Sequence, residues 1–270
     1  MRGLITKILF CLVAVAPSIC FTGCSTFNAF ERSDQQIVAR SYNPVQVQRG
    51  QPRPVIDMAA RVIALPSRIA VGDPRVDNHR VSPQTEVAIT NYLEQNGLGS
   101  VLVRSNQYAP VDELKRMIAN KNIRPIWKST FGSYNLLKYT LLPGRLTGGD
   151  WYNPYSDTLH VYSDFPAIAI AQATYAEDIR SRVNPGAYAA AKDIPLAGIS
   201  HDTTATKLAL KYYENQPSQE YEAAREGLYP SLGASYGSQL GSFVPYGGVI
   251  GKVVGAGIGR VASKLQNPQR

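Results

Sequence analysis

The residue types that could carry chemistry are densest between residues 150 and 182. An aromatic-rich turn over 150–157 leads into an expected edge strand over 158–164. A long apolar helix should follow from Phe165 to about Arg182, with Pro166 in its first turn. A strand followed by such a helix can present an H-E-x-x-H zinc site, because histidines at i and i+4 share one helix face and the glutamate activates water.

This stretch resembles a family of bacterial envelope proteins with a zincin-like, H-E-x-x-H metallopeptidase domain. In that family a Y-N-P-Y…L-Y-S-D segment runs straight into A-I-A-L-H-E-x-x-H-A-x-D, and Tyr152-Asn153-Pro154-Tyr155 matches its beginning. The similarity extends from about Leu65 to Gly259 and includes the segments 106–110 and 141–145. The resemblance implies an α+β, zincin-like domain.

The same resemblance implies that the metal site has degenerated. The first histidine falls on Ala171, the glutamate on Gln172, the second histidine on Tyr175, and the third ligand of a later helix on Ile199. Alanine and isoleucine have no lone pair to donate, an amide is not a base, and tyrosine binds metal only as a phenolate. We therefore expect a catalytically inactive domain without metal or cofactor, acting in binding or structure.

An active enzyme is the alternative. His160, Asp164 and His201 could converge as a different metal site, although scattered His and Asp residues in loops are more often hydrogen-bonded surface residues. The sequence has no Gly-x-Ser-x-Gly, no P-loop and no Gly-x-Gly-x-x-Gly after a strand. An envelope hydrolase would need a site of another kind.

The N-terminus has the pattern of a secretory signal. Two basic residues precede an apolar run over 8–21, which is too short to span the roughly 30 Å of a bilayer core as a helix. The run ends in Phe21-Thr22-Gly23-Cys24, which resembles the bacterial lipobox. That resemblance implies cleavage after residue 23 and acylation, including palmitate, at Cys24. Because Ser25 follows, it also implies the outer membrane, facing the periplasm, in a Gram-negative organism.

Cysteine usage agrees with a lipid anchor at Cys24. The chain has three cysteines, and Cys11 and Cys20 would leave with the signal peptide. The acylated chain then carries no free thiol in an oxidising compartment, which excludes cysteine catalysis and a disulfide scaffold. We expect a lipid-anchored protein of the bacterial cell envelope, with the membrane as a partner and no nucleic acid.

The composition fits one globular domain behind a tether. The 270 residues are 44% hydrophobic and carry a net charge of +8. The predicted parts are a signal peptide (1–23), a Gln- and Pro-rich lipidated tether (24–57), the α+β domain (58–230) and a glycine-repeat helical segment packed on it (231–264).

Short N-terminal strands should precede mostly helices in the domain. Ser82 and Pro83 form a strong helix start, and Asp202 and Ser218 are expected to cap two later helices. The other expected elements are strands near 62–65, 69–71, 101–103 and 159–162, and helices over 112–120, 203–215 and 219–228.

Seven basic residues and no acidic one lie between residues 115 and 149, with aromatic residues interleaved. They are Lys115, Arg116, Lys121, Arg124, Lys128, Lys138 and Arg145; the aromatic residues are Trp127, Phe131, Tyr134 and Tyr139. This pattern fits either contact with an anionic envelope component or a solvated basic face above core aromatics.

Glycines repeat at every fourth position near the C-terminus. They are Gly233, Gly237 and Gly241, then Gly247, Gly251, Gly255 and Gly259. Such spacing puts each set on one helix face and allows close helix packing. The helices could pack inside the domain, form a homo-oligomer, or enter the membrane with partners. Lys252 and Arg260 argue against a free-standing transmembrane helix.

Overall fold

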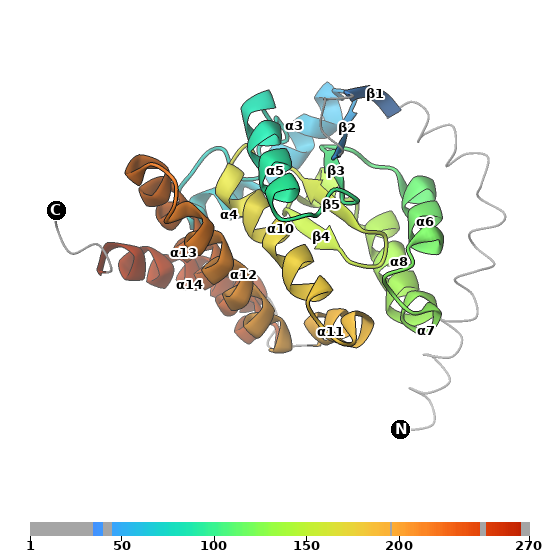
Figure 1. Cartoon of the computed structure of the whole chain (residues 1–270). Helices are drawn as coiled ribbons and strands as arrows, with labels where there is room; N and C mark the ends of the chain where they lie inside the picture. The colour runs from blue at the N-terminus through green and yellow to red at the C-terminus, as the bar shows by residue number, and fades with distance from the viewer. Residues whose placement is uncertain (1–34, 40–44, 195, 244–246, 266–270) are drawn as a thin grey trace.

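The computed structural model of the chain describes residues 35–39, 45–194, 196–243 and 247–265 (Figure 1). The predicted signal peptide, Cys24 and the first part of the predicted tether lie outside these residues. No helix of the described ranges combines the length and apolar character that crossing a membrane requires.

The described strands form one mixed sheet in the order β1-β2-β3-β5-β4. The strands are β1 (Gln35–Ala39), β2 (Gln46–Gly50), β3 (Leu102–Ser105), β4 (Trp151–Asn153) and β5 (Thr158–Val161). β2, β3 and β5 are parallel to one another, whereas β1 and β4 are antiparallel to β2 and β5. Arg104 of β3 pairs with His160 of β5, so these two side chains share one face of the sheet.

Helices lie between the strands and follow the last one, β5. They are α3 (Pro54–Ile63), α4 (Leu65–Val71), α5 (Pro83–Gln95), α6 (Pro110–Ala119), α7 (Pro125–Trp127), the π-helical turn η1 (Lys128–Gly132), α8 (Ser133–Leu141), α9 (Gly144–Thr147), α10 (Pro166–Arg180), α11 (Pro185–Lys192), α12 (Ala197–Tyr213), α13 (Ser218–Gly241) and α14 (Gly247–Leu265). The predicted α+β class is confirmed at this level.

The two faces of the sheet have different chemistry. Val103, Leu159 and Val161 face the hydrophobic core, where α10 packs on β4, β5 and α5. The opposite face carries Arg104 and His160 and is covered by α6 and α8 (Figure 1). Polar chemistry is therefore concentrated on one face and at the strand ends.

The predicted tether and the first predicted strands differ from the structure. Residues 35–39 and 46–50 form β1 and β2 of the sheet, and residues 54–57 begin α3, although all three fall in the predicted tether (24–57). The strands predicted near 62–65 and 69–71 are instead parts of α3 and α4. Each helix has a proline in its first turn, where the missing N–H costs nothing, and this start signal outweighs the β-branched residues.

Several later predictions are confirmed and others need correction. Ser82 caps α5 by accepting a hydrogen bond from the Thr85 N–H at 3.3 Å. The predicted edge strand, β5, is internal, because β4 lies outside it. Asp202 is not a cap but lies inside α12, where it accepts hydrogen bonds from α13. Ser218 is not a cap either, because it is the first residue of α13 and Pro217 is at the cap position. α13 runs past Pro230 to Gly241, where its glycine face packs on α14.

The repeated glycines lie where α13 and α14 touch. A Cβ atom on Gly237 would lie 1.7 Å from the carbonyl oxygen of Gly251, and one on Gly255 would lie 1.9 Å from that of Gly233. Gly241 and Gly247 meet in the same way. Only glycine permits this backbone-to-backbone approach, so both sets serve a contact within the chain.

Candidate functional site

A polar network is buried between the sheet and α6. The Arg104 guanidinium donates to Glu113 of α6 at 3.3 Å and to Gln107 at 2.6 Å, and it forms an ion pair with Asp112. Glu113 also accepts hydrogen bonds, which come from Asn153 at 2.9 Å, His160 at 3.3 Å and Ser156. We call these seven residues the Arg104 network.

In the Arg104 network, Arg104 and Glu113 are charged and His160 is neutral. Burial would raise the pKa of Glu113, but the hydrogen bonds from His160 and Ser156 and the charge of Arg104 outweigh it and lower that pKa. Burial lowers the pKa of His160. Because ionised Glu113 can only accept, His160 Nε2–H donates to it, and His160 Nδ1 is left buried without a partner. His160 and Ser156 are 0% and 1% exposed, so this network fastens α6 to the sheet.

A second polar cluster lies at the carboxyl ends of β3 and β5. Asn106 follows β3 and Ser163 follows β5, while Asp77 and His79 come from the loop between α4 and α5 and Asp150 precedes β4. We call these five residues the end-of-sheet cluster. The carboxyl ends of parallel strands are the usual place for ligands in open sheets, so this position makes the cluster a candidate site.

Hydrogen bonds connect the cluster across long stretches of sequence. The Asp77 N–H donates to the Ser163 hydroxyl at 3.0 Å, and the Gly149 N–H donates to Asp77 Oδ1 at 2.6 Å. Asp150 Oδ1 accepts from the backbone N–H groups of Tyr162 at 2.6 Å and Ser163 at 3.0 Å.

The backbone of the cluster is strained. Asp77, His79 and Asn106 have φ angles of 47°, 56° and 46°, in the left-handed region that favours glycine. Each such residue costs on the order of 1–3 kcal/mol, and strain of this kind concentrates at functional sites. Five described non-glycine residues have a positive φ, and three of them lie in this cluster.

His79 has one ring nitrogen in use and one unused. Asn106 Nδ2 donates to the His79 carbonyl at 3.0 Å, which fixes the amide so that Asn106 Oδ1 accepts from His79 Nδ1 at 3.1 Å. Burial lowers the pKa of His79, so its ring is neutral at pH 7. Nε2 then carries a free lone pair and is buried without a partner, as a general base would be.

Asp150 is a carboxyl group that could donate a proton where His79 accepts one. Burial, together with the charge of Asp77, raises the pKa of Asp150 to about 8. Its Oδ2 is buried and has no hydrogen-bond partner, so it bears an unused proton at pH 7. A neutral imidazole and a protonated carboxyl in one cluster can accept and donate a proton, respectively.

The alternative metal site is contradicted by the structure. His160 belongs to the Arg104 network, Asp164 accepts hydrogen bonds from Ser82 and Thr85 at the start of α5, and His201 lies on α12 beside Tyr175. Within the described ranges, no three His, Cys, Asp or Glu side chains are grouped so that they could hold a metal ion.

The residues that the resemblance assigns to the degenerate metal site lie on α10 and α12. Ala171 and Tyr175 are 5% and 1% exposed, and Gln172 is partly exposed on the same helix. The α12 residue that meets Tyr175 is His201, with ring centroids 5.5 Å apart and planes at 89°. Ile199 lies two residues earlier, about 200° around the helix, so it does not share the side of α12 on which His201 meets Tyr175.

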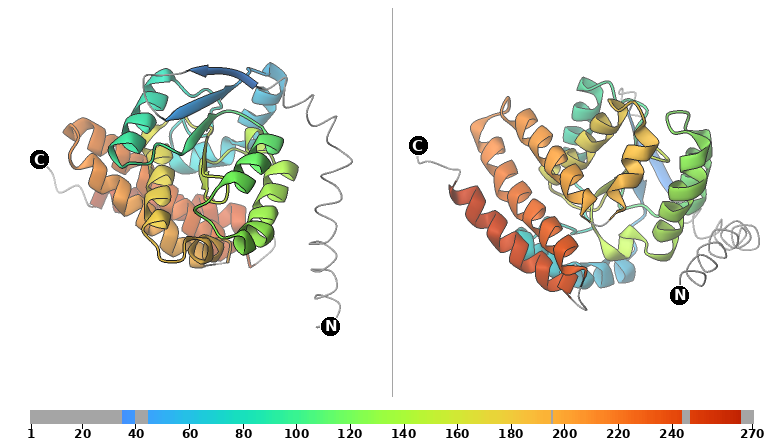
Figure 2. Two further views of the ribbon diagram at one scale, coloured as in Figure 1. Left: turned by 45° about the vertical axis from the view of Figure 1, so that its right-hand side comes forward. Right: turned by 90° about the horizontal axis from the view of Figure 1, so that it is seen from below.

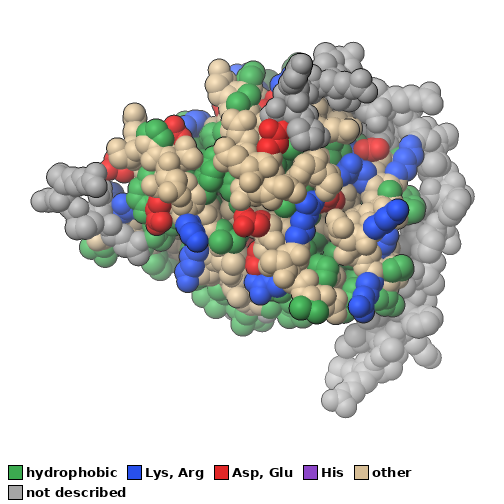
Figure 3. Space-filling view, viewed as in Figure 1, with side chains coloured by type: hydrophobic (Ala, Val, Ile, Leu, Met, Phe, Trp, Pro, Cys, Tyr) green, Lys and Arg blue, Asp and Glu red, His purple; other side chains and the backbone are tan. Residues whose placement is uncertain are grey.

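The basic stretch divides into internal and exposed groups. Arg116 donates to backbone carbonyls of residues 100, 156 and 157, Lys128 to those of 118 and 120, and Arg145 pairs with buried Asp57. The exposed members are Lys115, Lys121, Arg124 and Lys138. Figure 3 shows Lys and Arg side chains over α6, α7 and α8, where an anionic partner would meet only these exposed groups.

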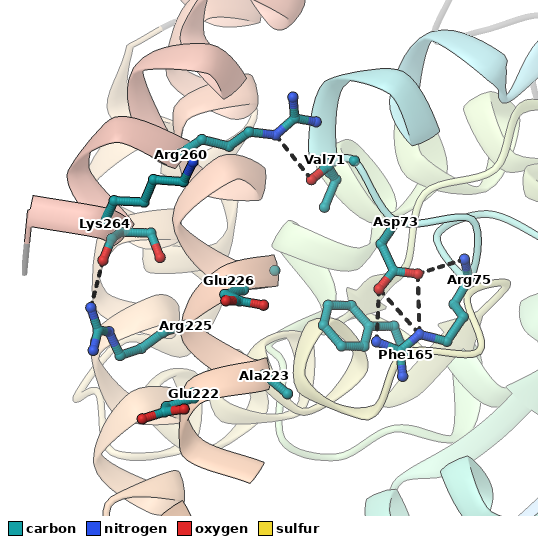
Figure 4. Close-up of a pocket in the computed structure, with 13 residues that line it drawn as sticks. Val71, Asp73, Arg75, Phe165, Glu222, Ala223, Arg225, Glu226, Arg260 and Lys264 are labelled. Carbon is teal, nitrogen blue, oxygen red and sulfur yellow. Dashed lines mark hydrogen bonds and ion pairs between the residues drawn. The ribbon is translucent and has the colours of Figure 1, made fainter. Parts of the chain in front are cut away.

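A pocket of about 380 Å³ lies between α13, α14 and the loop after α4 (Figure 4). Its arginines already have structural partners: Arg225 donates to the Ser263 carbonyl, Arg260 to the carbonyls at the end of α4, and Arg75 pairs with Asp73. Glu222 and Glu226 also line it, so the lining mixes both charges and favours no ligand class.

Comparison of the chain with protein-family models, curated proteins and solved structures finds no match. The function must therefore be argued from the geometry above.

The sequence alone does not reveal the end-of-sheet cluster. Asp77 and Ser163 are 86 residues apart in sequence, and only the fold brings them together. The available signal is Asp77-Asn78-His79, because these residue types tolerate the left-handed backbone region better than most others.

Proposed function

We propose that the chain is a lipid-anchored cell-envelope protein whose zincin-like domain is catalytically inactive and acts in binding or structure. The observation that carries this proposal is the packing of Tyr175 against His201, with Lys192 Nζ 4.0 Å from the Tyr175 ring centroid. A metal cleft would need histidines at positions 171 and 175, but Ala171 and the buried Tyr175 ring, packed against His201, are there instead. A zinc ion does not fit the residues present.

Restoring ligands tests the zincin-like part of the proposal. Two imidazoles on one zinc ion, with Zn–N bonds of about 2.0–2.1 Å, have centroids roughly 5 Å apart. The 5.5 Å between the Tyr175 and His201 rings is close to this spacing. The double variant Ala171→His, Tyr175→His adds two imidazoles at i and i+4 beside native His201.

We expect this double variant to gain zinc-dependent stabilisation of about 2.7 kcal/mol when free zinc is 100 times Kd. Thermal melting with and without zinc measures it, and the same variant with His201→Ala is the matched control. A folded double variant that gains no zinc affinity would count against the zincin-like geometry. If the wild-type protein bound one zinc ion per chain, the proposal that the domain is inactive because it lost its metal would be wrong.

The lipid anchor has a separate test. Cys24→Ser should abolish incorporation of a palmitate analogue, because the thiol is the expected acceptor. Unchanged incorporation in this variant would contradict anchoring at Cys24.

An envelope hydrolase is the second candidate function, and the end-of-sheet cluster favours it. His79 would act as general base and protonated Asp150 as general acid, with the Ser163 hydroxyl beside them. His79→Gln should then abolish hydrolysis of peptide or ester substrates that the wild type cleaves. Wild-type protein that cleaves none of these substrates would exclude this role.

A further inference from the structure

The outer side of α3 is apolar, where a surface helix normally carries polar side chains. Val55, Met58, Val62 and Ile63 are 82%, 65%, 62% and 53% exposed. The acidic residue of this helix, Asp57, is buried instead. α3 therefore turns its apolar side outward, which is unfavourable in water unless something covers it.

The same surface continues through α4 onto α14. Lys252 donates to Ser67 of α4 at 2.6 Å, and Arg260 donates to the Ile69 and Ala70 carbonyls at 2.6 Å each, which fixes α14 beside α4. The right-hand view of Figure 2 shows α14, α4 and α3 following one another along one edge. We call the exposed apolar residues here the apolar face: Val55, Met58, Val62, Ile63, Leu65, Ile69, Val249, Ile250, Val253, Val254, Ile258, Val261 and Leu265. Soluble monomers rarely expose so large an apolar surface.

The three helices of the apolar face carry exposed charges of one sign. α4 and α14 contain no acidic residue, and the acidic residue of α3 is buried. Basic residues lie on all three helices: Arg61, Arg68, Lys252, Arg260 and Lys264. Arg68, Lys252 and Arg260 also donate hydrogen bonds to α4 or to the loop after it, and the acidic residues beside the Arg260 end come from other elements. An occupant of the apolar face should therefore be apolar at its centre and anionic at its edge.

We propose that the apolar face lies on an anionic lipid bilayer. Helices that lie in the plane of a membrane bury their apolar side about 5–10 Å into the boundary between headgroups and acyl chains, and lysines and arginines reach back to the phosphates. α3, α4 and α14 offer this combination along one edge of the domain. None of them is apolar enough to span the bilayer, which agrees with an in-plane position.

This proposal rests on the proposed function in one respect, the anchor at Cys24. Cys24 precedes Gln35 by eleven residues, which span at most about 40 Å when fully extended. A chain anchored there keeps β1 within that distance of the bilayer. The anchor would make docking an intramolecular event with a high effective concentration.

A second copy of the chain fits the apolar face less well. A two-fold contact would bring the same surface of both copies together, so the basic borders would face each other. Like charges across an interface are unfavourable, whereas lipid phosphates neutralise them.

An environment-sensitive fluorophore on an introduced cysteine tests the proposal in the full chain. Val254→Cys places the label on α14. Asn91→Cys is the matched control, at an exposed position of α5. The purified chain is reconstituted with vesicles of phosphatidylethanolamine and phosphatidylglycerol. We expect a blue shift for the label at position 254 and none at position 91. Val62→Glu on α3 should remove the shift at 254 without changing Tm, because both helices would meet the same membrane.

The outcomes separate docking from anchoring. Absence of a blue shift at 254 overturns the proposal, whatever the state of Cys24. A blue shift without vesicles, together with a doubled mass, also overturns it in favour of a second copy. The parent chain without an introduced cysteine reports on the anchor: label uptake there reveals free native thiols and counts against acylation at Cys24, but it leaves the result at position 254 interpretable.

Discussion

The Arg104 network and the end-of-sheet cluster both bury polar groups beside the same parallel strands, but they use them differently. In the Arg104 network the guanidinium and both carboxylates have hydrogen-bonded partners, the backbone is unstrained, and one buried atom, His160 Nδ1, has no partner. In the end-of-sheet cluster, His79 Nε2 and Asp150 Oδ2 have none, and three residues have a strained backbone. Buried charge alone therefore does not mark a functional site. Unused hydrogen-bonding capacity combined with strain is the more specific sign.

The largest expected loss of unfolding free energy comes from disrupting the Arg104 network. Arg104→Met leaves Glu113, which is 1% exposed, without its buried cation. Removing one partner of a buried ion pair typically costs about 3–5 kcal/mol of unfolding free energy. Urea denaturation measures the loss. The control Arg75→Met removes an exposed pair with Asp73 and should cost about 0–1 kcal/mol. Equal losses would mean that the Arg104 network does not hold the fold.

A substitution in the end-of-sheet cluster should have a smaller effect and should raise the unfolding free energy instead of lowering it. The pKa of Asp150 is about 8 in the folded chain and about 3.9 when unfolded, so the unfolded state releases this proton first and stability falls as pH rises between these values. Asp150→Asn keeps the acceptor oxygen and removes the charge. At pH 9 it should be more stable than wild type by at least about 1.4 kcal/mol, and this advantage should vanish near pH 4.

Asp164→Asn is the control with the opposite pH dependence. Burial would raise the pKa of Asp164, but hydrogen bonds from Ser82 and Thr85 lower it. Its contribution to stability is therefore present above the unfolded pKa and is lost on acidification. Asp164→Asn should lower Tm at neutral pH and have little effect in acid. If both variants showed the same pH profile, the assigned protonation of Asp150 would be wrong.

The smallest effect concerns the coupling inside the cluster. Asp77→Asn keeps the acceptor for the Gly149 N–H and suits a φ of 47°. It removes the charge that helps to raise the pKa of Asp150. The pH at which the advantage of Asp150→Asn levels off follows the folded pKa, so it should shift downward in this background by a fraction of a unit, whereas the onset near the unfolded pKa should not move. A double-mutant cycle followed by thermal melting across pH measures the shift. An unchanged levelling-off pH would show that burial alone sets that pKa.

Local signals predicted the fold where they were strong. Ser82 with Pro83 marks the start of α5, and Pro166 marks that of α10, because capping and proline geometry act within one turn. β2 was not predictable in this way. Its sequence Gln-Val-Gln-Arg-Gly is mostly polar, and its place in the sheet comes from backbone pairing with β1 and β3.

The candidate site was less accessible to sequence reasoning than the fold. Asp150 begins the aromatic-rich turn, but the sequence did not mark it, since its pKa depends on burial and on Asp77, which lies 73 residues away. The predicted packing glycines followed from spacing alone, since helix periodicity places them on one side. Spacing could not show that α14 also packs on α4, because that contact depends on hydrogen bonds from Lys252 and Arg260 that leave no periodic signal.

The contact between α4 and α14 also constrains when the chain can finish folding. Arg260 binds carbonyl oxygens that precede it by about 190 residues, and α14 ends close to the C-terminus. Contacts at such sequence separation form late, because a long loop must close first. A chain shortened before residue 247 lacks α14 and leaves α4 uncovered, so we expect it to be recognised by chaperones and proteases.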